Sequence, residues 1–310
     1  MFTTLPRLGC LLLLVLASGR MTPEVDANTI YIQGTSGNDV AHVFQRSNGD
    51  YRLVFNGQVT DYDPSSCFIY FEGLSGNDTF INSTDLDCTG FGDGGNDVLI
   101  SNGGAAYFMG GEGNDDLYGG PQSDILIGGA GEDLLIGEAG EDCLEGGRDD
   151  DVLYGGQGED HLFGGQGDDR LYGQRDNDWL LGQQGDDRCF GGLGDDTILG
   201  NEGDDKLYGE SGNDSLYGNS GQDRLGGGSG EDLLCGGSDD DRLFGNSGND
   251  VLLGGSGNDE LVGGTGDDLE DQHGGCMNPM YLQGGCGCSE DGGGEGQPQP
   301  EAPAFGDPIE

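Results

Sequence analysis

The stretch Gly110-Gly111-Glu112-Gly113-Asn114-Asp115-Asp116-Leu117-Tyr118 carries the pattern that decides the fold. It reads G-G-x-G-x-D-x-U-x, in which U is an apolar residue, and this phrase recurs eighteen times without an insertion through residues 110–271. A further copy at residues 92–100 keeps the same register, although the residues between the two lack the aspartate. Repetition at so short a period predicts a solenoid, in which each repeat buries its apolar side chain by stacking on its neighbours.

One apolar residue in each repeat supplies the predicted core. The eighth position is leucine in most copies, Cys189 and Ile198 in two of them, and Glu270 in the last. Because side chains alternate along a strand, the apolar residue of x-U-x faces one side and its two neighbours face the other. We therefore expect an all-β fold of three-residue strands, stacked on one another around a continuous ladder of leucines.

The other six residues of each repeat predict a turn that is rich in oxygen ligands. Glycines permit positive φ and a close approach of backbones, which leaves carbonyl oxygens exposed beside the aspartate at the sixth position. Stacked carboxylates repel one another unless a cation lies between them, and oxygen ligands without thiolate or imidazole favour calcium. The candidate metal ligands are therefore Asp97, Asp115, Asp124, Asp133, Asp142, Asp151, Asp160, Asp169, Asp178, Asp187, Asp196, Asp205, Asp214, Asp223, Asp232, Asp241, Asp250, Asp259 and Asp268.

With this pattern the chain resembles the RTX, or haemolysin-type calcium-binding, proteins, whose nonapeptide repeats form a parallel β-roll. The resemblance covers slightly more than half of the chain. It implies that two successive repeats make one full coil, and that several calcium ions bind between turns on the same edge. Local departures from the pattern predict weaker or reshaped sites where the glycine at the fourth position of the repeat is replaced, at Gln122, Asp149, Asp176 and Asp239.

Residues 20–91 are irregular but rich in β-branched and aromatic residues. Three runs predict strands, at residues 29–33, 51–55 and 67–71. The phrases that end at Asp39 and Asp78 look like diverged copies of the turn. We expect this region to be a β-rich cap, because the open end of a solenoid core must be covered.

The two ends of the chain are expected to lie outside the roll. Residues 1–19 read as a secretory signal peptide, with Arg7, a short apolar run and small residues before the cleavage point, and predict a secreted bacterial protein. Residues 272–310 combine a Cys-containing segment with a Gly/Pro/acidic tail that is expected to be disordered. The roll is thus assigned to residues 92–271.

The composition is strongly acidic, with 59 acidic residues against 11 basic ones and a formal net charge of −48. Such a surface repels nucleic acid and anionic lipid, and it opposes its own compaction, so an acidic chain without a counter-ion is expected to be disordered. No long apolar run follows the signal peptide, and we expect no membrane insertion. Of the cysteines, Cys143, Cys189 and Cys235 have no obvious partners, and no disulfide connectivity follows from the sequence.

If two repeats make one coil, odd and even repeats form opposite sheets with different outer faces. The odd sheet carries two outward rows, one of Arg170, Arg188, Lys206, Arg224 and Arg242, and one of Tyr154, Tyr172, Phe190, Tyr208, Gly226 and Phe244. A cationic row beside an aromatic row predicts either an anionic polysaccharide as partner or simple compensation of the acidic turns.

The outward residues of the even sheet are largely apolar: Ile125, Ile127, Trp179, Leu181, Leu199, Tyr217, Leu233, Leu253 and Leu269. An apolar exterior of that extent usually marks a contact surface. We expect self-association through this face. Another partner or a folded-back N-terminal region are the alternatives.

No catalytic motif is present: the sequence contains no HExxH helix, G-x-S-x-G elbow or phosphate loop, and we expect no enzyme activity. The favoured function is a secreted, calcium-ion-binding β-roll that folds when calcium binds and acts as a structural, cell-surface or matrix module. The alternatives are a carbohydrate-binding module that uses the Arg/Tyr outer face, and an accessory module of an extracellular enzyme or toxin system.

Overall fold

The computed structural model describes residues 29–62 and 68–274. Every regular element among them is a β-strand, and the described ranges contain no helix of the length and apolarity that a bilayer span requires. The expected signal peptide, Cys67 and residues 275–310 lie outside these ranges.

Nine strands come before the regular array: β1 (Thr29–Gln33), β2 (Val40–Gln45), β3 (Tyr51–Phe55), β4 (Gln58–Tyr62), β5 (Phe68–Glu72), β6 (Thr79–Ser83), β7 (Asp87–Gly94), β8 (Val98–Ser101) and β9 (Ala106–Glu112). The array contributes β10 (Asp116–Gly120), β11 (Ile125–Ala130), β12 (Leu134–Ala139), β13 (Cys143–Arg148), β14 (Val152–Gln157), β15 (His161–Gln166), β16 (Arg170–Arg175), β17 (Trp179–Gln184), β18 (Arg188–Leu193), β19 (Thr197–Glu202), β20 (Lys206–Ser211), β21 (Ser215–Ser220), β22 (Arg224–Ser229), β23 (Leu233–Ser238), β24 (Arg242–Ser247), β25 (Val251–Ser256), β26 (Glu260–Thr265) and β27 (Leu269–Asp271).

The expectation of three-residue strands was wrong for this array, because most strands are six residues long. Each runs from the residue before U to the third residue of the next repeat, as in β11. Gly129 and Ala130, the second and third residues of their repeat, are in register with Gly147 and Arg148 of the next coil. Pairing of the G-G-x backbone therefore extends the sheet, and only the fourth to sixth residues of a repeat form the turn.

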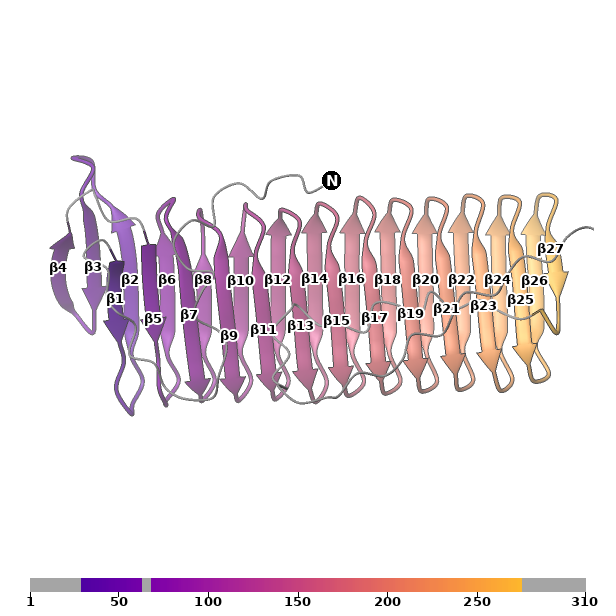
Figure 1. Ribbon diagram of the computed structural model, residues 1–310, viewed down its shortest axis with the longest axis horizontal. Helices are drawn as coiled ribbons and strands as arrows, with labels where there is room; N and C mark the ends of the chain where they lie inside the picture. The colour runs from indigo at the N-terminus through magenta and orange to yellow at the C-terminus, as the bar shows by residue number, and fades with distance from the viewer. Residues whose placement is uncertain (1–28, 63–67, 275–310) are drawn as a thin grey trace, which may run out of the picture. The chain divides into compact units, whose positions relative to one another are not determined.

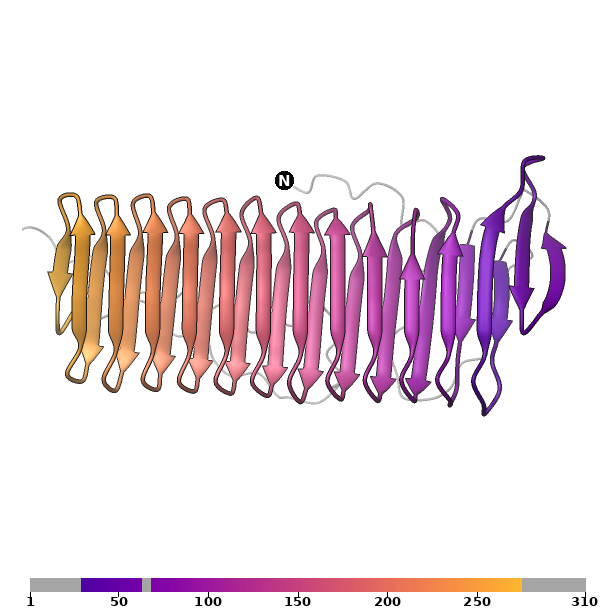
Figure 2. The same ribbon diagram turned by 180° about the vertical axis from the view of Figure 1, so that it is seen from behind.

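The strands alternate between two parallel sheets, as the resemblance implied. Sheet A has the order β1-β5-β7-β9-β11 and then the odd-numbered strands to β27, and sheet B runs from β26 through the even-numbered strands to β6, β2, β3 and β4. Equivalent residues in successive coils are eighteen apart, as with Leu117 and Leu135. Two repeats thus make one coil, and the coils stack along one axis (Figures 1 and 2).

The N-terminal strands continue the same two sheets. Strands β1, β5 and β7 extend sheet A, and β2, β6 and β8 extend sheet B, all through parallel pairing. Only β3 and β4 pair antiparallel, as a meander on β2. Two expected strands, at residues 29–33 and 51–55, are observed as β1 and β3.

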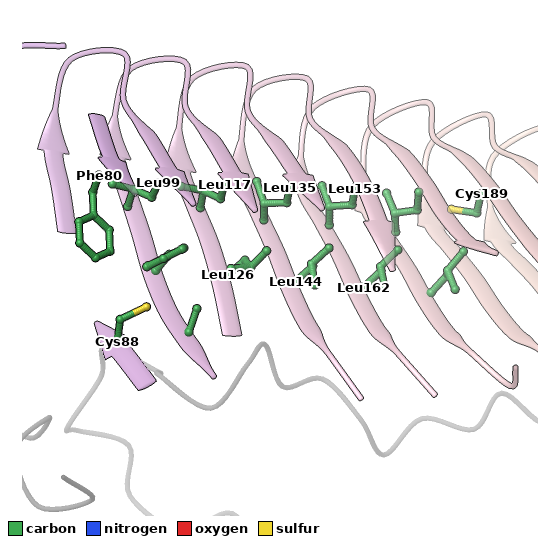
Figure 3. Packing of buried hydrophobic residues seen from close by; sticks show 14 of the residues in the cluster. Phe80, Cys88, Leu99, Leu117, Leu126, Leu135, Leu144, Leu153, Leu162 and Cys189 are labelled. Atoms are coloured by element: carbon green, nitrogen blue, oxygen red, sulfur yellow. The ribbon is translucent and has the colours of Figure 1, made fainter. Parts of the chain in front are cut away.

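The core is a ladder of apolar side chains between the two sheets (Figure 3). Leucines such as Leu117, Leu126 and Leu135 are fully buried, and Cys189 takes the same place in the ladder. Toward the N-terminus, phenylalanines replace the leucines, and the rings of Phe71 and Phe80 stack with centroids 5.0 Å apart. The larger rings fill the less regular coils where the period of the sequence breaks.

Candidate metal sites along the two edges

The turns of the roll require a left-handed backbone at the fourth residue of the repeat. Gly167 and Gly185 adopt φ of 129° and 125° there, whereas the described non-glycine residues with positive φ stay between 47° and 84°. Asp149, Asp176 and Asp239 keep the turn with φ between 71° and 78°. Gln122 does not adopt positive φ, so the turn that contains it is reshaped.

All of the predicted aspartates lie in these turns, in two rows. Turns from sheet A to sheet B form the first edge, which carries Asp97, Asp115, Asp133, Asp151, Asp169, Asp187, Asp205, Asp223, Asp241 and Asp259. Turns from sheet B to sheet A form the second edge, which carries Asp124, Asp142, Asp160, Asp178, Asp196, Asp214, Asp232, Asp250 and Asp268.

One oxygen of each carboxylate links neighbouring coils. The backbone N–H of Asp169 donates to Oδ1 of Asp187 at 2.8 Å, and the N–H of Asp178 donates to Oδ1 of Asp196 at 2.8 Å. The same bond recurs between coils along both edges. It fixes the orientation of each carboxylate, because Oδ1 is tied to the neighbouring main chain and Oδ2 then points to a defined place.

The second oxygen has no such partner. Within the described residues, Oδ2 is buried without a hydrogen bond in every predicted aspartate except Asp268, which is half-buried at the end of its row. A buried polar atom without a partner costs free energy, and a whole row of them is unusual in a folded protein. These oxygens therefore indicate a ligand that binds along the edges.

The space beside each Oδ2 is kept open by the first glycine of the repeat. A Cβ on Gly128 would lie 2.3 Å from Oδ2 of Asp133 and 2.6 Å from the carbonyl oxygen of Gly146 in the next coil. A carboxylate oxygen and a carbonyl oxygen thus converge on a volume that any side chain would fill. Within the described part of the chain no three His, Cys, Asp or Glu side chains gather round one point, so main-chain oxygens must complete each ligand set.

Burial makes a negative charge on these carboxylates unfavourable in the absence of a cation. It raises the pKa of Asp151 to about 9 and the pKa values of Asp124 and Asp187 to about 8, and nearby carboxylates add to the effect. A divalent cation between coils would offset both the burial and the repulsion. The residues present fit calcium, which prefers carboxylate and carbonyl oxygens.

Comparison with protein families agrees with this geometry. The family described as RTX calcium-binding nonapeptide repeat (4 copies) matches residues 109–144, 136–171, 163–198, 199–234 and 236–270. The chain belongs to this family. A search of curated proteins found no match to the chain.

Asp78 extends the first-edge row of the RTX roll beyond the predicted residues. Its Oδ2 is buried without a hydrogen bond, and burial raises its pKa to about 6. A Cβ on Gly73 would lie 2.4 Å from that oxygen and 2.7 Å from the carbonyl oxygen of Gly92, which is the arrangement of the regular repeats. The diverged turn phrase that ends at Asp78 was the signal in the sequence.

Asp39 lies one coil further along the first edge but differs in its surroundings. The N–H of Thr35 donates to its Oδ2 at 2.5 Å, and the side-chain amide of Asn56 donates to its Oδ1. Burial alone would raise the pKa of Asp39, but these hydrogen bonds outweigh it and lower the pKa. Asp39 therefore ends the row with neutral partners in place of a cation.

The row of RTX-type turns begins later in the chain on the second edge than on the first. Ala106 stands where an aspartate would be, and its N–H donates to Oδ1 of Asp124 at 2.6 Å. The preceding turn is held by uncharged side chains: the N–H of Thr84 donates to Oδ1 of Asn82 at 3.0 Å, and the N–H of Leu86 donates to Oγ1 of Thr84 at 3.1 Å. The first RTX-type turn on this edge is therefore the turn of Asp124.

Proposed function

We propose that this chain is an exported, non-catalytic protein whose RTX roll folds as calcium binds along both edges. The folded roll then acts as a structural, cell-surface or matrix module. The observation that carries the proposal is the pair of rows of buried Oδ2 atoms, each beside a carbonyl oxygen of the next coil.

Folding is coupled to calcium in this proposal because the ligand sets exist only when coils are stacked. A cation that binds the folded chain alone stabilises it, and a site built from two coils has no counterpart in the unfolded chain. Low cytosolic calcium would keep the chain unfolded for export. Calcium near the millimolar range outside the cell would then fold it.

Replacing Asp78 by Asn is expected to remove one calcium ion from the loaded protein. The amide keeps an acceptor for the N–H of Asp39, which now donates to Oδ1 of Asp78 at 2.7 Å, but it loses the charged oxygen. Native mass spectrometry at saturating calcium measures the number of bound ions. Asp39→Asn is the matched control and should keep the wild-type number. An unchanged number in Asp78→Asn would remove this residue from the calcium sites.

The histidines of the described chain support a non-catalytic role. Nε2 of His42 lies 2.9 Å from Oγ of Ser83, but within the described ranges no carboxylate is hydrogen-bonded to this pair. Burial lowers the pKa of His42, and its ring packs against that of Phe44 at a tilt, with the ring centroids 5.1 Å apart. A serine and a histidine without an orienting carboxylate lack the third group of the usual nucleophile arrangement.

A second candidate function is binding of an anionic polysaccharide to the outer face of sheet B. Arg170, Arg188 and Lys206 occupy successive coils, and among the described residues they form no ion pair, whereas Arg242 pairs with Glu260 at 3.4 Å. Ion pairs with the acidic turns therefore do not account for the row. A row of unpaired cations fits a polymer with regularly spaced anionic groups.

The aromatic row beside these cations contributes less than expected from the sequence. Ring centroids are 4.7 Å apart between Tyr154 and Tyr172, and 5.1 Å apart between Phe190 and Tyr208, with nearly parallel planes. Because the rings stack on one another, a sugar meets their edges instead of their faces. Recognition on this face would be mainly ionic.

Replacing Arg188 by Glu is expected to abolish binding of an anionic polysaccharide such as alginate, because it places a negative charge in the middle of the cationic row. Binding is measured by affinity electrophoresis in calcium. Arg148→Glu makes the same change of charge at an exposed position on sheet A and should leave binding intact. Equal binding by both variants, or none by the wild-type protein, would exclude this function.

A further inference from the structure

On sheet A from β15 to β25, the residues on either side of the core position are uncharged, although the chain carries a formal charge of −48. Side chains that flank the core residue point outward from these strands. In chain order they are His161, Phe163, Trp179, Leu181, Thr197, Leu199, Ser215, Tyr217, Leu233, Cys235, Val251 and Leu253. None of them is Asp, Glu, Lys or Arg. We call this surface the apolar face.

We propose that residues 275–286 of this chain lie along the apolar face and are joined to it by a disulfide between Cys143 and Cys286. The segment begins where the roll ends, since β27 belongs to sheet A. It carries no charged residue, and it contains Met277, Met280, Tyr281 and Leu282. The residues that follow are acidic and do not match an apolar surface.

Burial of the apolar face supports a cover of this kind. Leu181 and Leu199 are 4% and 5% exposed, and Tyr217 is 8% exposed, although they point away from the core. The residues at the same position on sheet B, Tyr172 and Tyr208, are half-buried even though they stack on their neighbours. Figures 1 and 2 show the two sheets only against each other, so no described strand covers the apolar face.

The surroundings of Trp179 point to the same place. Its indole N–H is buried without a hydrogen-bond partner in the described residues. Beside it the surface is hollowed by about 420 Å³, and this hollow is lined by Cys143, His161 and Thr197 and by the acidic turn residues Glu141, Asp142, Glu159, Asp178 and Asp195. An extended segment that crossed this hollow would supply carbonyl oxygens for the indole N–H.

Cys143, which opens β13, is disulfide-bonded, and its partner is not among the described residues. Seven strand spacings separate β13 from β27, which is about 34 Å. Cys276 follows Asp271 by five residues and reaches at most about 18 Å, which is too short. Cys286 follows Asp271 by fifteen residues and reaches about 50 Å, so it is the first cysteine after the roll that can span the distance.

Two cysteines before the array are excluded for different reasons, and Cys288, which also reaches Cys143, is separated from Cys286 by the test below. Cys67 immediately precedes β5, which is four strand spacings from β13, or about 19 Å. One residue cannot bridge that distance, because the Cα atoms of a disulfide lie within about 7 Å of each other. Cys10 belongs to the expected signal peptide and would be removed on export.

The bond forms by ordinary thiol oxidation. The two thiols, of Cys143 and Cys286, each lose one proton and one electron as their sulfur atoms join. A disulfide-carrying oxidant outside the cytosol takes up the two protons and two electrons and is reduced to two thiols. Refolding in calcium with a glutathione redox buffer supplies the same oxidant in vitro, so the test does not depend on export.

Peptide mapping of the full, calcium-loaded chain without reduction tests the bond. Chymotrypsin cuts after Tyr281 and Leu282, which separates Cys276 from Cys286, and the variant Cys288→Ser leaves Cys286 as the one cysteine of its peptide. The expected result is a peptide that contains Cys143 joined to one that contains Cys286. A bond from Cys143 to any other cysteine, or an unbonded Cys143, would overturn the proposal.

The fluorescence of Trp179, the one tryptophan of the chain, tests the contact itself. In the calcium-loaded chain the indole should be shielded from acrylamide. The double variant Met280→Asp/Leu282→Asp should raise the quenching constant severalfold and shift the emission to longer wavelength. Phe305→Asp, in the acidic tail, should leave both unchanged. Circular dichroism of each variant in calcium confirms that the roll is folded.

The competing occupant of the apolar face is a second copy of the chain, since the sequence predicts self-association through this face. Sedimentation of the wild-type chain should show a monomer whose Trp179 is shielded at every concentration. A dimer that exposes Trp179 on dilution would show that a second copy covers the face and would overturn the proposal. A Trp179 that is freely quenched in the wild-type monomer would do the same.

Discussion

Removal of calcium with EGTA is expected to abolish the β-sheet signal of the chain, and excess calcium is expected to restore it. Within the described residues nineteen aspartates hold a buried Oδ2 without a hydrogen bond. Without a cation each carboxylate must be either charged in a poorly solvated place or protonated, and both states cost free energy. The net stability of a typical domain is only about 5–15 kcal/mol, so a small cost at each site is enough to unfold the roll.

Far-UV circular dichroism during a calcium titration measures this effect. The transition should be cooperative along the roll, because each coil is stabilised mainly by its neighbours. Magnesium is the control ion: it demands a smaller octahedral site and gives up water reluctantly, so it should not restore the signal at the same concentration. A β-sheet signal that persists in EGTA would contradict the coupling of folding to calcium.

Replacing Gly185 by Ala is expected to destabilise the calcium-loaded roll by about 3 kcal/mol, since overpacking and backbone strain each cost roughly 1–3 kcal/mol. The backbone of Gly185 has φ of 125°, a conformation that alanine rarely adopts. A Cβ there would lie 1.9 Å from the carbonyl oxygen of Gly167 in the preceding coil. The turn must shift, and the carbonyl and carboxylate oxygens of that edge shift with it.

Urea unfolding at saturating calcium measures the change, and Gly226→Ala is the matched control. Gly226 faces outward on sheet B, and the atom nearest to an added Cβ would be in the ring of Tyr208 at 3.3 Å, which is free to move slightly. This control should change the free energy of unfolding by less than about 0.5 kcal/mol. Equal stability of the two variants would show that the turns do not depend on close contact between coils.

Much of the fold follows from the repeat itself. The nine-residue period predicts which residues form the core, since the leucines at the eighth position are fully buried in the structure, apart from Leu261 at the end of the roll, which is partly buried. The parity of the repeats predicts that Arg188 lies on one sheet and Trp179 on the other, which the register confirms. Each of these features depends only on stacking at a fixed spacing.

The features that the sequence did not predict depend on main-chain contacts between coils. Strand length was underestimated because the G-G-x segment was assigned to the turn, whereas its N–H and C=O groups pair with the next coil. Asp78 was missed because the irregular coils space their turns unevenly: its N–H donates to Asp97, nineteen residues away, whereas regular repeats are eighteen apart. A pattern with a fixed nine-residue period therefore no longer places the aspartates of these coils correctly.

The disulfide of Cys143 was also out of reach of sequence reasoning. A cysteine before the core position has no distinguishing local pattern, and only the order of strands in sheet A converts positions in the chain into distances. Once those distances are known, most of the other cysteines are too far away. Topology thus supplies what spacing along the sequence could not.

The central claim is that the rows of buried Oδ2 atoms are calcium sites, and anomalous diffraction from crystals of the calcium-loaded protein tests it most directly. Peaks are predicted along both edges, beginning at the turn of Asp78 on the first edge and at the turn of Asp124 on the second. No peak is predicted at Asp39, whose carboxylate already has neutral partners. A folded roll without anomalous peaks beside these carboxylates would contradict the account.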